Sequence, residues 1–137
     1  MTFRFEDAYP ASTAFRESPA LRIPSGWSIG WNSLRSSMES DRSGIGGSTL
    51  YNATNTGARF NIDVTFEPEC DPQGTFSLRV AYAPWPRSDR GRRIRDQPLS
   101  FADALIVHAF ETRSYIELVA ELEHWIARCS VWIREGN

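Results

Sequence analysis

The chain contains no lysine, and this absence removes two kinds of chemistry. All fifteen basic residues among its 137 are arginine. Schiff-base catalysis and lysine-dependent phosphate loops are therefore excluded. Two interpretations of the bias are open: a GC-rich genome, which we favour, or selection for the planar, bidentate contacts that arginine makes and lysine does not.

Cysteine and histidine are also scarce, which restricts catalytic and metal sites. The chain has two of each, Cys70, Cys129, His108 and His124. Two cysteines in this length are no disulfide framework, and a reduced, cytoplasmic setting fits them. The pattern contains no CxxC pair for zinc, and no nucleophile adjoins a histidine along the chain. We therefore expect no metal, no cofactor and no catalytic set, although a spatial pairing of a histidine with Cys70 stays open.

Long apolar runs and a strong net charge are missing as well. Residues 1–7 include early acids and do not resemble a signal peptide, and no later segment has the length of a transmembrane helix. The net charge of −2 is unlike that of most nucleic-acid-binding domains. We therefore expect one domain, residues 1–137, that is cytoplasmic and binds neither membrane nor nucleic acid directly.

What the chain does contain is a clear alternation of apolar and polar residues. Every second residue from Phe60 to Phe66 is apolar, and the pattern returns from Phe76 to Tyr82. Residues 69–74 between them are rich in turn formers, so we predict an antiparallel hairpin with one apolar face. The other segments with strand character are residues 21–23, 27–34 and 49–53.

Two segments, residues 27–34 and residues 99–110, allow more than one interpretation. Trp27, Ile29 and Trp31 share one face of a regular strand, but Gly30 predicts a bulge or a close backbone approach.

In residues 99–110, Ser100 and Asp103 resemble a helix capping box, whereas residues 105–110 are β-branched and short, like a buried strand. We favour the strand.

The last element is predicted to be a long amphipathic helix. Ser114 and Glu117 have the spacing of a capping box. The apolar positions that follow form one helical stripe: Tyr115, Val119, Leu122, Ile126, Cys129 and Ile133. That stripe must pack on the apolar face of the strands. The predicted fold class is therefore α+β, an antiparallel sheet (a meander of about five strands) packed against a long C-terminal helix.

Acidic residues form the strongest candidate site. Asp63, Glu67, Glu69 and Asp71 share parity along the hairpin, so a regular strand would place them in one row on its outer face. Such a row is most often a solvated surface. It could also be an acid/base pair, which needs a cleft, or a docking strip for a basic partner.

Two further segments carry charge. Glu39 and Asp41 lie in a long polar loop, residues 35–48, of a length that is often functional. Residues 87–95 contain five arginines, flanked by Trp85 and Asp96. This arginine loop is either an exposed connector, which we favour, or a site that holds phosphate or stacks on bases.

In its small size, acidic strand face and lack of a catalytic set, the chain resembles the immunity proteins of bacterial contact-dependent and other polymorphic toxin systems. The resemblance is one of type and involves no diagnostic motif. It implies a cytoplasmic, non-enzymatic inhibitor that neutralises a cognate toxin, commonly a basic nuclease, by covering an essential surface. The residues that would face lysines and arginines of the toxin are Glu39, Asp41, Asp63, Glu67, Glu69 and Asp71.

Two other functions remain open. In a small enzyme or ligand-binding domain, the five tryptophans would line a pocket between sheet and helix, although an aromatic core explains them more simply. A secretion chaperone or adaptor would dimerise through a helix or a sheet edge.

Overall fold

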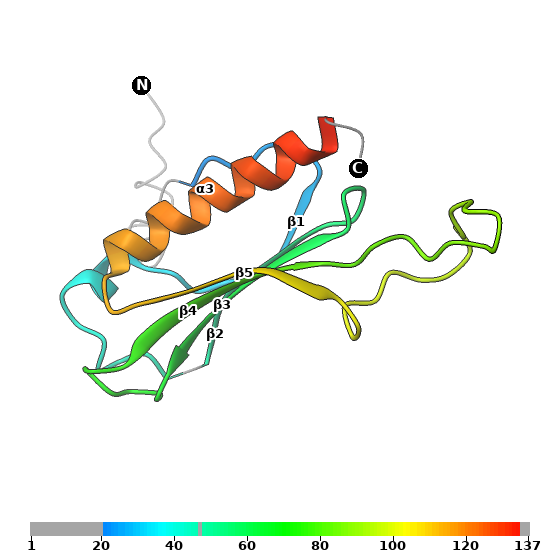
Figure 1. Cartoon of the computed structure of the whole chain (residues 1–137). Coiled ribbons are helices and arrows are strands. Elements are labelled where there is room, and N and C mark those ends of the chain that lie inside the picture. The colour runs from blue at the N-terminus through cyan, green and yellow to red at the C-terminus, as the bar shows by residue number, and fades with distance from the viewer. Residues whose placement is uncertain (1–20, 47, 135–137) are drawn as a thin grey trace, which may run out of the picture.

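The computed structural model describes residues 21–46 and 48–134 (Figure 1). Within this part the chain forms five strands, one 3-10 helix and one α-helix. In chain order they are β1 (Trp27–Asn32), η1 (Ser36–Glu39), β2 (Thr49–Asn55), β3 (Phe60–Glu67), β4 (Thr75–Tyr82), β5 (Leu105–Thr112) and α3 (Tyr115–Arg134).

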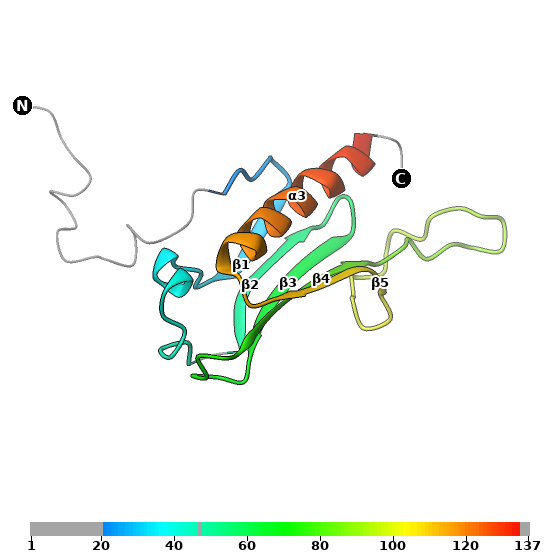
Figure 2. The ribbon, with the colours of Figure 1, turned by 60° about the vertical axis from the view of Figure 1, so that its left-hand side comes forward.

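The strands make one antiparallel sheet in the order β1-β2-β3-β4-β5, so each strand pairs with its neighbour in the chain. Helix α3 lies across one face of this sheet, and the two views agree on this arrangement (Figures 1 and 2). The predicted meander packed against a C-terminal helix is therefore confirmed.

The core lies between α3 and the inner face of the sheet. Ile62, Val64 and Phe66 of β3 are opposite Val80, Leu78 and Phe76 of β4, and all six are fully buried. The predicted stripe of α3 supplies the other layer through Leu122, Ile126 and Cys129, and Leu118 lies beside them; all four are also fully buried. Each large apolar side chain removed from water in this way contributes roughly 1.5–3 kcal/mol before entropy is subtracted.

Helix α3 begins where the sequence indicated. The Ser114 hydroxyl accepts a hydrogen bond from the backbone N–H of Glu117 at 3.2 Å. The Glu117 carboxylate accepts one from the Thr112 hydroxyl at 2.8 Å. These contacts satisfy a free N–H of the first turn and place a negative charge at the positive end of the helix.

The bulge predicted at Gly30 is present and changes the face of one tryptophan. Ile29 pairs with Ala53, but Trp31 pairs with Asn52, so the register shifts between Ile29 and Trp31. Because side chains alternate along a strand, this shift moves Trp31 to the outer face, where it is 56 % exposed. The prediction that Trp27, Ile29 and Trp31 share one face was wrong for Trp31.

The segment left open between strand and helix is strand β5, as favoured, but it is not a buried strand. Because β5 is an edge strand, Leu105 and Ile106 are each 57 % exposed and Val107 is 39 % exposed. The helix-like signal at Ser100 is a local turn, in which the Ser100 hydroxyl accepts the N–H of Ala102 at 3.2 Å.

The predicted strand at residues 21–23 does not form. Leu21 and Ile23 instead pack against the core without ladder pairing.

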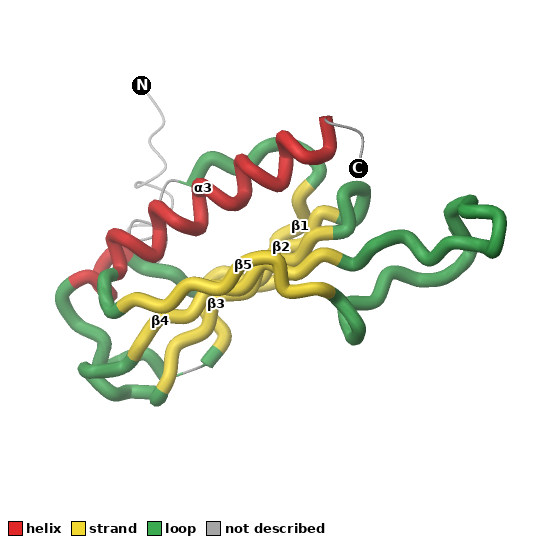
Figure 3. Tube along the Cα trace, viewed as in Figure 1, coloured by secondary structure: helices red, strands yellow, loops and turns green. Residues whose placement is uncertain are grey.

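The long connections gather at two opposite ends of the sheet (Figure 3). At one end lie the loop around η1, the β3–β4 turn and the start of α3. At the other end the segment between β4 and β5 extends away from the body as an arm (Figure 3). We call residues 85–96 the arginine arm.

Candidate functional site

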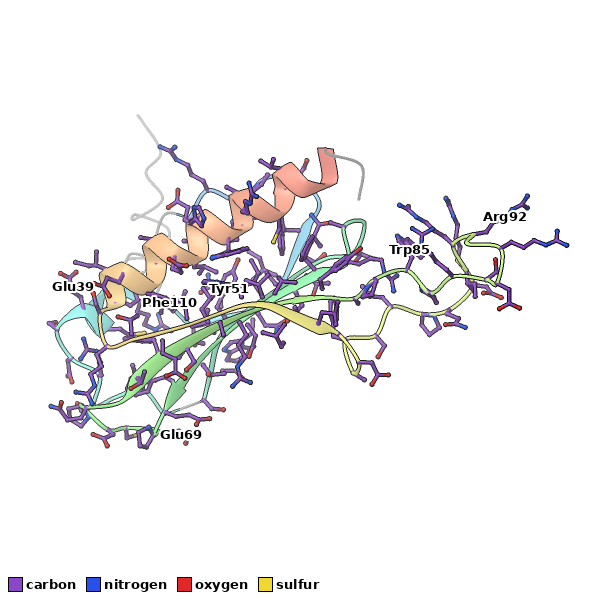
Figure 4. All side chains as sticks on the ribbon, in the orientation of Figure 1. Glu39, Tyr51, Glu69, Trp85, Arg92 and Phe110 are labelled. Carbon is purple, nitrogen blue, oxygen red and sulfur yellow. The ribbon has the colours of Figure 1, made fainter. Side chains whose placement is uncertain are left out.

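The structure separates Asp63, in the middle of the sheet, from the other five predicted acids, which lie at one end of the molecule. Strand β3 ends at Glu67, so only Asp63 and Glu67 lie on its outer face, while Glu69 and Asp71 belong to the β3–β4 turn. The predicted row of four carboxylates along one strand is therefore wrong. The turn nevertheless lies at the same end of the molecule as Glu39 and Asp41, and Figure 4 shows Glu39 and Glu69 at that end.

Backbone contacts explain why the polar loop and the turn come together. The N–H of Cys70 donates to the carbonyl of Ile45 at 2.7 Å, and the N–H of Phe66 donates to the carbonyl of Ser48 at 2.8 Å. Ile45 is itself buried in the core. The predicted loop at residues 35–48 is thus attached, after its charged residues, to the β3–β4 turn through Ile45 and to β3 through Ser48.

The β3–β4 turn is held against the core by a glycine. Gly74 lies directly on the ring of Phe66, and a Cβ at this position would overlap that ring. Phe66 and Phe76 pack with their ring centroids 5.1 Å apart beneath the turn. The carboxylates of the turn are therefore displayed from a rigid base.

Two of the acids are fixed by local hydrogen bonds. Asp41 accepts hydrogen bonds from the hydroxyl of Ser43 at 2.6 Å and from its N–H at 3.0 Å, and these bonds lower the pKa of Asp41 below its usual value. Asp71 accepts the N–H of Gln73 at 2.8 Å. Both carboxylates are thereby oriented.

Sequence reasoning missed two acids at this end. Glu111 lies opposite Ser77 near the end of β5, and Glu117 lies in the first turn of α3. Neither is close to the hairpin in the sequence, and only the pairing of β5 with β4 brings them there. We define the acidic end by seven residues, Glu39, Asp41, Glu67, Glu69, Asp71, Glu111 and Glu117.

The arginines of the same end balance fewer than half of these charges. Within residues 21–46 and 48–134 they are Arg35, Arg42 and Arg113, three against seven carboxylates. The guanidinium of Arg42 lies over the ring of Phe76, 5.7 Å from its centroid, and so leans towards the core. A basic partner would therefore meet a net negative surface.

Asp63 has a different environment in the middle of the outer face. It accepts a hydrogen bond from the side chain of Asn52 at 3.1 Å and lies opposite Arg79 on β4. Asn61 extends this network by donating to Asn52 and Thr54 at 3.2 and 3.0 Å. Asp63 is thus part of a polar ladder on the sheet and not of the acidic end.

His108 faces the opposite side of the sheet from Asp63. Its ring stacks on Trp125 with centroids 4.3 Å apart, and its Nε2 lies 2.9 Å from Glu121 Oε1. Trp125 donates to the same carboxylate oxygen at 2.9 Å. Glu121 is half-buried in this cluster.

The sequence left open whether a histidine lies close to Cys70 in space, and His108 does not. Cys70 lies in the turn beyond β3, whereas His108 pairs with Val80, five residues along β4 from Thr75. At about 3.4 Å per residue that separation is roughly 17 Å.

The tryptophans described by the structure do not line one pocket. Trp27 contacts α3 through a 3.3 Å hydrogen bond to Ser130, and Trp125 lies at the other flank of the helix, against β5. Trp31 is on the outer face, and Trp85 is in the arginine arm. These four tryptophans therefore lie in separate surroundings, while the side chain of Trp132 lies outside the described residues, and an aromatic pocket stays a prediction.

The arginine arm has a structure of its own. Arg87 and Arg93 form an isolated antiparallel bridge, and the N–H of Ser88 donates to the carbonyl of Arg92 at 2.8 Å. Gly91 adopts a φ of +78°, which glycine tolerates and which closes the tip. Figure 4 shows Trp85 at the base of the arm and Arg92 near its tip.

Comparisons with known proteins leave this geometry as the basis for any assignment. No family model, no curated protein and no solved structure matches the chain. Among the described residues no group of three or more histidine, cysteine, aspartate or glutamate side chains is arranged to hold a metal ion. Helix α3 is not apolar enough over its length to cross a membrane.

Proposed function

We propose that this protein is a non-enzymatic inhibitor, of the immunity-protein type, that binds a basic toxin through its acidic end. The observation that carries the proposal is the gathering of carboxylates from η1 and its loop, the β3–β4 turn, β5 and α3 at one end of the sheet (Figures 3 and 4). A cytoplasmic setting and a nuclease-like partner belong to the same proposal.

The physical basis is a charged surface that is already in place before binding. Negative charges that repel one another are held together here by the Cys70–Ile45 and Phe66–Ser48 hydrogen bonds and by Gly74 on Phe66. A fixed surface loses little conformational entropy on association. Clustered charge of one sign also accelerates encounter with a partner of opposite sign, by 10-fold or more at low salt.

The test is co-expression with the product of the gene directly upstream. The proposal expects the two proteins to co-purify and cells that make both to survive. A chain that neither binds that product nor rescues cells from it would contradict the proposal.

The binding surface is tested by the variant Glu67→Gln/Glu69→Gln/Asp71→Asn. Asparagine at position 71 keeps an oxygen for the Gln73 N–H, so the turn is preserved. We expect association to slow about 10-fold or more at low salt. The matched control, Asp89→Asn/Asp96→Asn, removes carboxylates from the arginine arm and should leave the rate unchanged. Equal effects of the two variants would remove the acidic end from the interface.

A second candidate, an adaptor that dimerises through a sheet edge, is favoured by β5. Leu105, Ile106 and Val107 are consecutive, exposed and apolar on an edge strand, where proteins usually place charge. A second copy could pair with β5 and continue the sheet. The molecular mass in solution decides this: a dimer that Ile106→Lys converts to a monomer supports the adaptor, and a monomeric parent protein contradicts it.

A further inference from the structure

An arginine lies buried where the arginine arm leaves the sheet. Arg59 is 6 % exposed and follows the β2–β3 turn with a φ of +64°, a conformation uncommon outside glycine. Its carbonyl accepts the N–H of Ala83 at 2.9 Å, and its Nε–H donates to the carbonyl of Ala83 at 2.6 Å. The side chain is thereby fixed at the point where β4 passes into the arm.

The charge of Arg59 has no carboxylate partner in the described part of the chain. Its guanidinium forms no ion pair within 4.0 Å there. Its Cζ lies 4.3 Å from the centroid of the Trp85 ring, and Arg93 approaches the same ring at 5.6 Å. The aromatic contact stabilises a cation only modestly, whereas burial of an uncompensated charge is considerably more costly. The guanidinium of Arg59 is therefore a buried cation without a directly paired carboxylate, and an anion that reached it would offset the cost of burial.

The same arginine lines a pocket of about 290 Å³. Its side walls include prolines, which are rigid and apolar, and its polar groups come from the segment that returns to β5. The lining residues used in this argument are Pro84, Pro86, Pro98, Gln97, Ser100 and Asp103.

We propose that this pocket binds the carboxylate group of a small molecule, with Arg59 as its anchor. A guanidinium presents a planar set of donors that matches a carboxylate. The Ser100 hydroxyl accepts the N–H of Ala102, so its own hydrogen is available to donate, and the Gln97 amide adds two donors. Asp103 on the wall opposes additional negative charge, which favours a singly charged carboxylate over a phosphate dianion.

The pocket lies at the other end of the sheet from the acidic end. Carboxylate binding by the pocket can therefore be tested independently of toxin binding by the acidic end. It also assigns a function to a residue that the sequence did not single out. Arg59 follows a turn signal and precedes a strand, and nothing local indicates that its side chain is buried.

The experiment is an NMR titration of the ¹⁵N-labelled full chain with acetate, benzoate and inorganic phosphate. We expect saturable shifts of the Arg59 Nε–H and of the Gln97 and Ser100 amides with both carboxylates, and weaker binding of phosphate. Shifts that do not saturate, that spread over the exposed arginines of the arm, or that phosphate produces more strongly than the carboxylates would overturn the proposal.

Two variants separate ligand binding from a purely structural role of Arg59. Arg59→Lys keeps the charge but loses the planar set of donors, and should weaken benzoate binding at least 10-fold. Since this variant also loses the contact to Ala83, Ser100→Phe provides an independent test, because it fills the exposed side of the pocket and leaves Arg59 intact. The matched control, Arg95→Gln, removes an exposed arginine of the arm and should bind as the parent does. Undiminished binding by Ser100→Phe would overturn the proposal.

Discussion

The acidic end and the arginine arm carry opposite charge at opposite ends of one sheet, and they are built differently. Backbone hydrogen bonds from Cys70 and Phe66 attach the acidic end to the body. The hydrogen bonds of the arm, such as those from Ser88 to Arg92 and from Ile94 to Pro86, join the arm to itself. The two regions differ in more than the sign of their charge. Attachment to the core distinguishes them, because it decides whether a charge is presented in a fixed position.

The largest expected difference between the two regions is in stability. Phe66 is fully buried beneath the acidic end, so Phe66→Ala should lower the free energy of unfolding by about 3–5 kcal/mol. Trp85 is half-buried at the base of the arm, and Trp85→Ala should remove about 1 kcal/mol, mainly its contact with Arg59. Urea unfolding of both variants measures the difference. Similar losses would show that the arm is as much a part of the core as the acidic end.

The second expected effect is a loss of folding stability at alkaline pH, caused by two buried tyrosines. Burial raises the pKa of Tyr51 to about 12, and burial followed by the negative charge of Glu39 raises that of Tyr115 to about 12. In the unfolded chain both phenols lose their protons near pH 10, before they do so in the folded state. Stability should therefore fall as the pH rises from 10 to 12, by at most roughly 2–3 kcal/mol for each tyrosine.

The variant Tyr51→Phe tests this dependence. Its hydroxyl is buried without a hydrogen-bond partner in the described structure, so its removal should not reduce stability at pH 7. The same variant should make the urea midpoint fall less steeply above pH 10. An unchanged alkaline slope would mean that Tyr51 does not contribute to it.

The smallest expected effect is on the reaction rate of a thiol, which reports the local electrostatic potential at each end of the sheet. Cys70 is exposed at the acidic end, whereas burial raises the pKa of the Cys129 thiol to about 12 and protects it in the folded protein. An anionic disulfide reagent should react slowly with Cys70, and more rapidly, by a few-fold, when salt screens the carboxylates.

A thiol placed in the arm by Ser88→Cys, with Cys70→Ser in the same chain, should behave in the opposite way. There the arginines attract the anionic reagent, so added salt should slow the reaction. A neutral disulfide reagent provides the control for differences in exposure. Equal salt dependence at both positions would contradict the separation of charge between the ends.

Local patterns were enough to predict the framework of this fold. Alternation from Phe60 to Tyr82 identified β3 and β4, and the Ser114–Glu117 spacing with its apolar stripe identified α3. These signals succeed because each depends on residues only a few positions apart.

Features that depend on distant contacts could not be predicted in this way. The shift at Gly30 moves Trp31 to the other face, and only the pairing with β2 shows it. Exposure of Leu105 follows from the edge position of β5, which its apolar composition conceals. The acidic end is a similar case, since Glu111 joins Glu69 only after the strands have paired.

The projecting arm has a consequence for how the chain can be divided. Its exposed arginines Arg87, Arg90 and Arg92 are targets for trypsin, and a single cut there would separate β1–β4 from β5 and α3. The two fragments would still share the β4–β5 ladder and the interface beneath α3. The protein therefore offers, near the tip of the arm, a site for splitting into two pieces that reassemble.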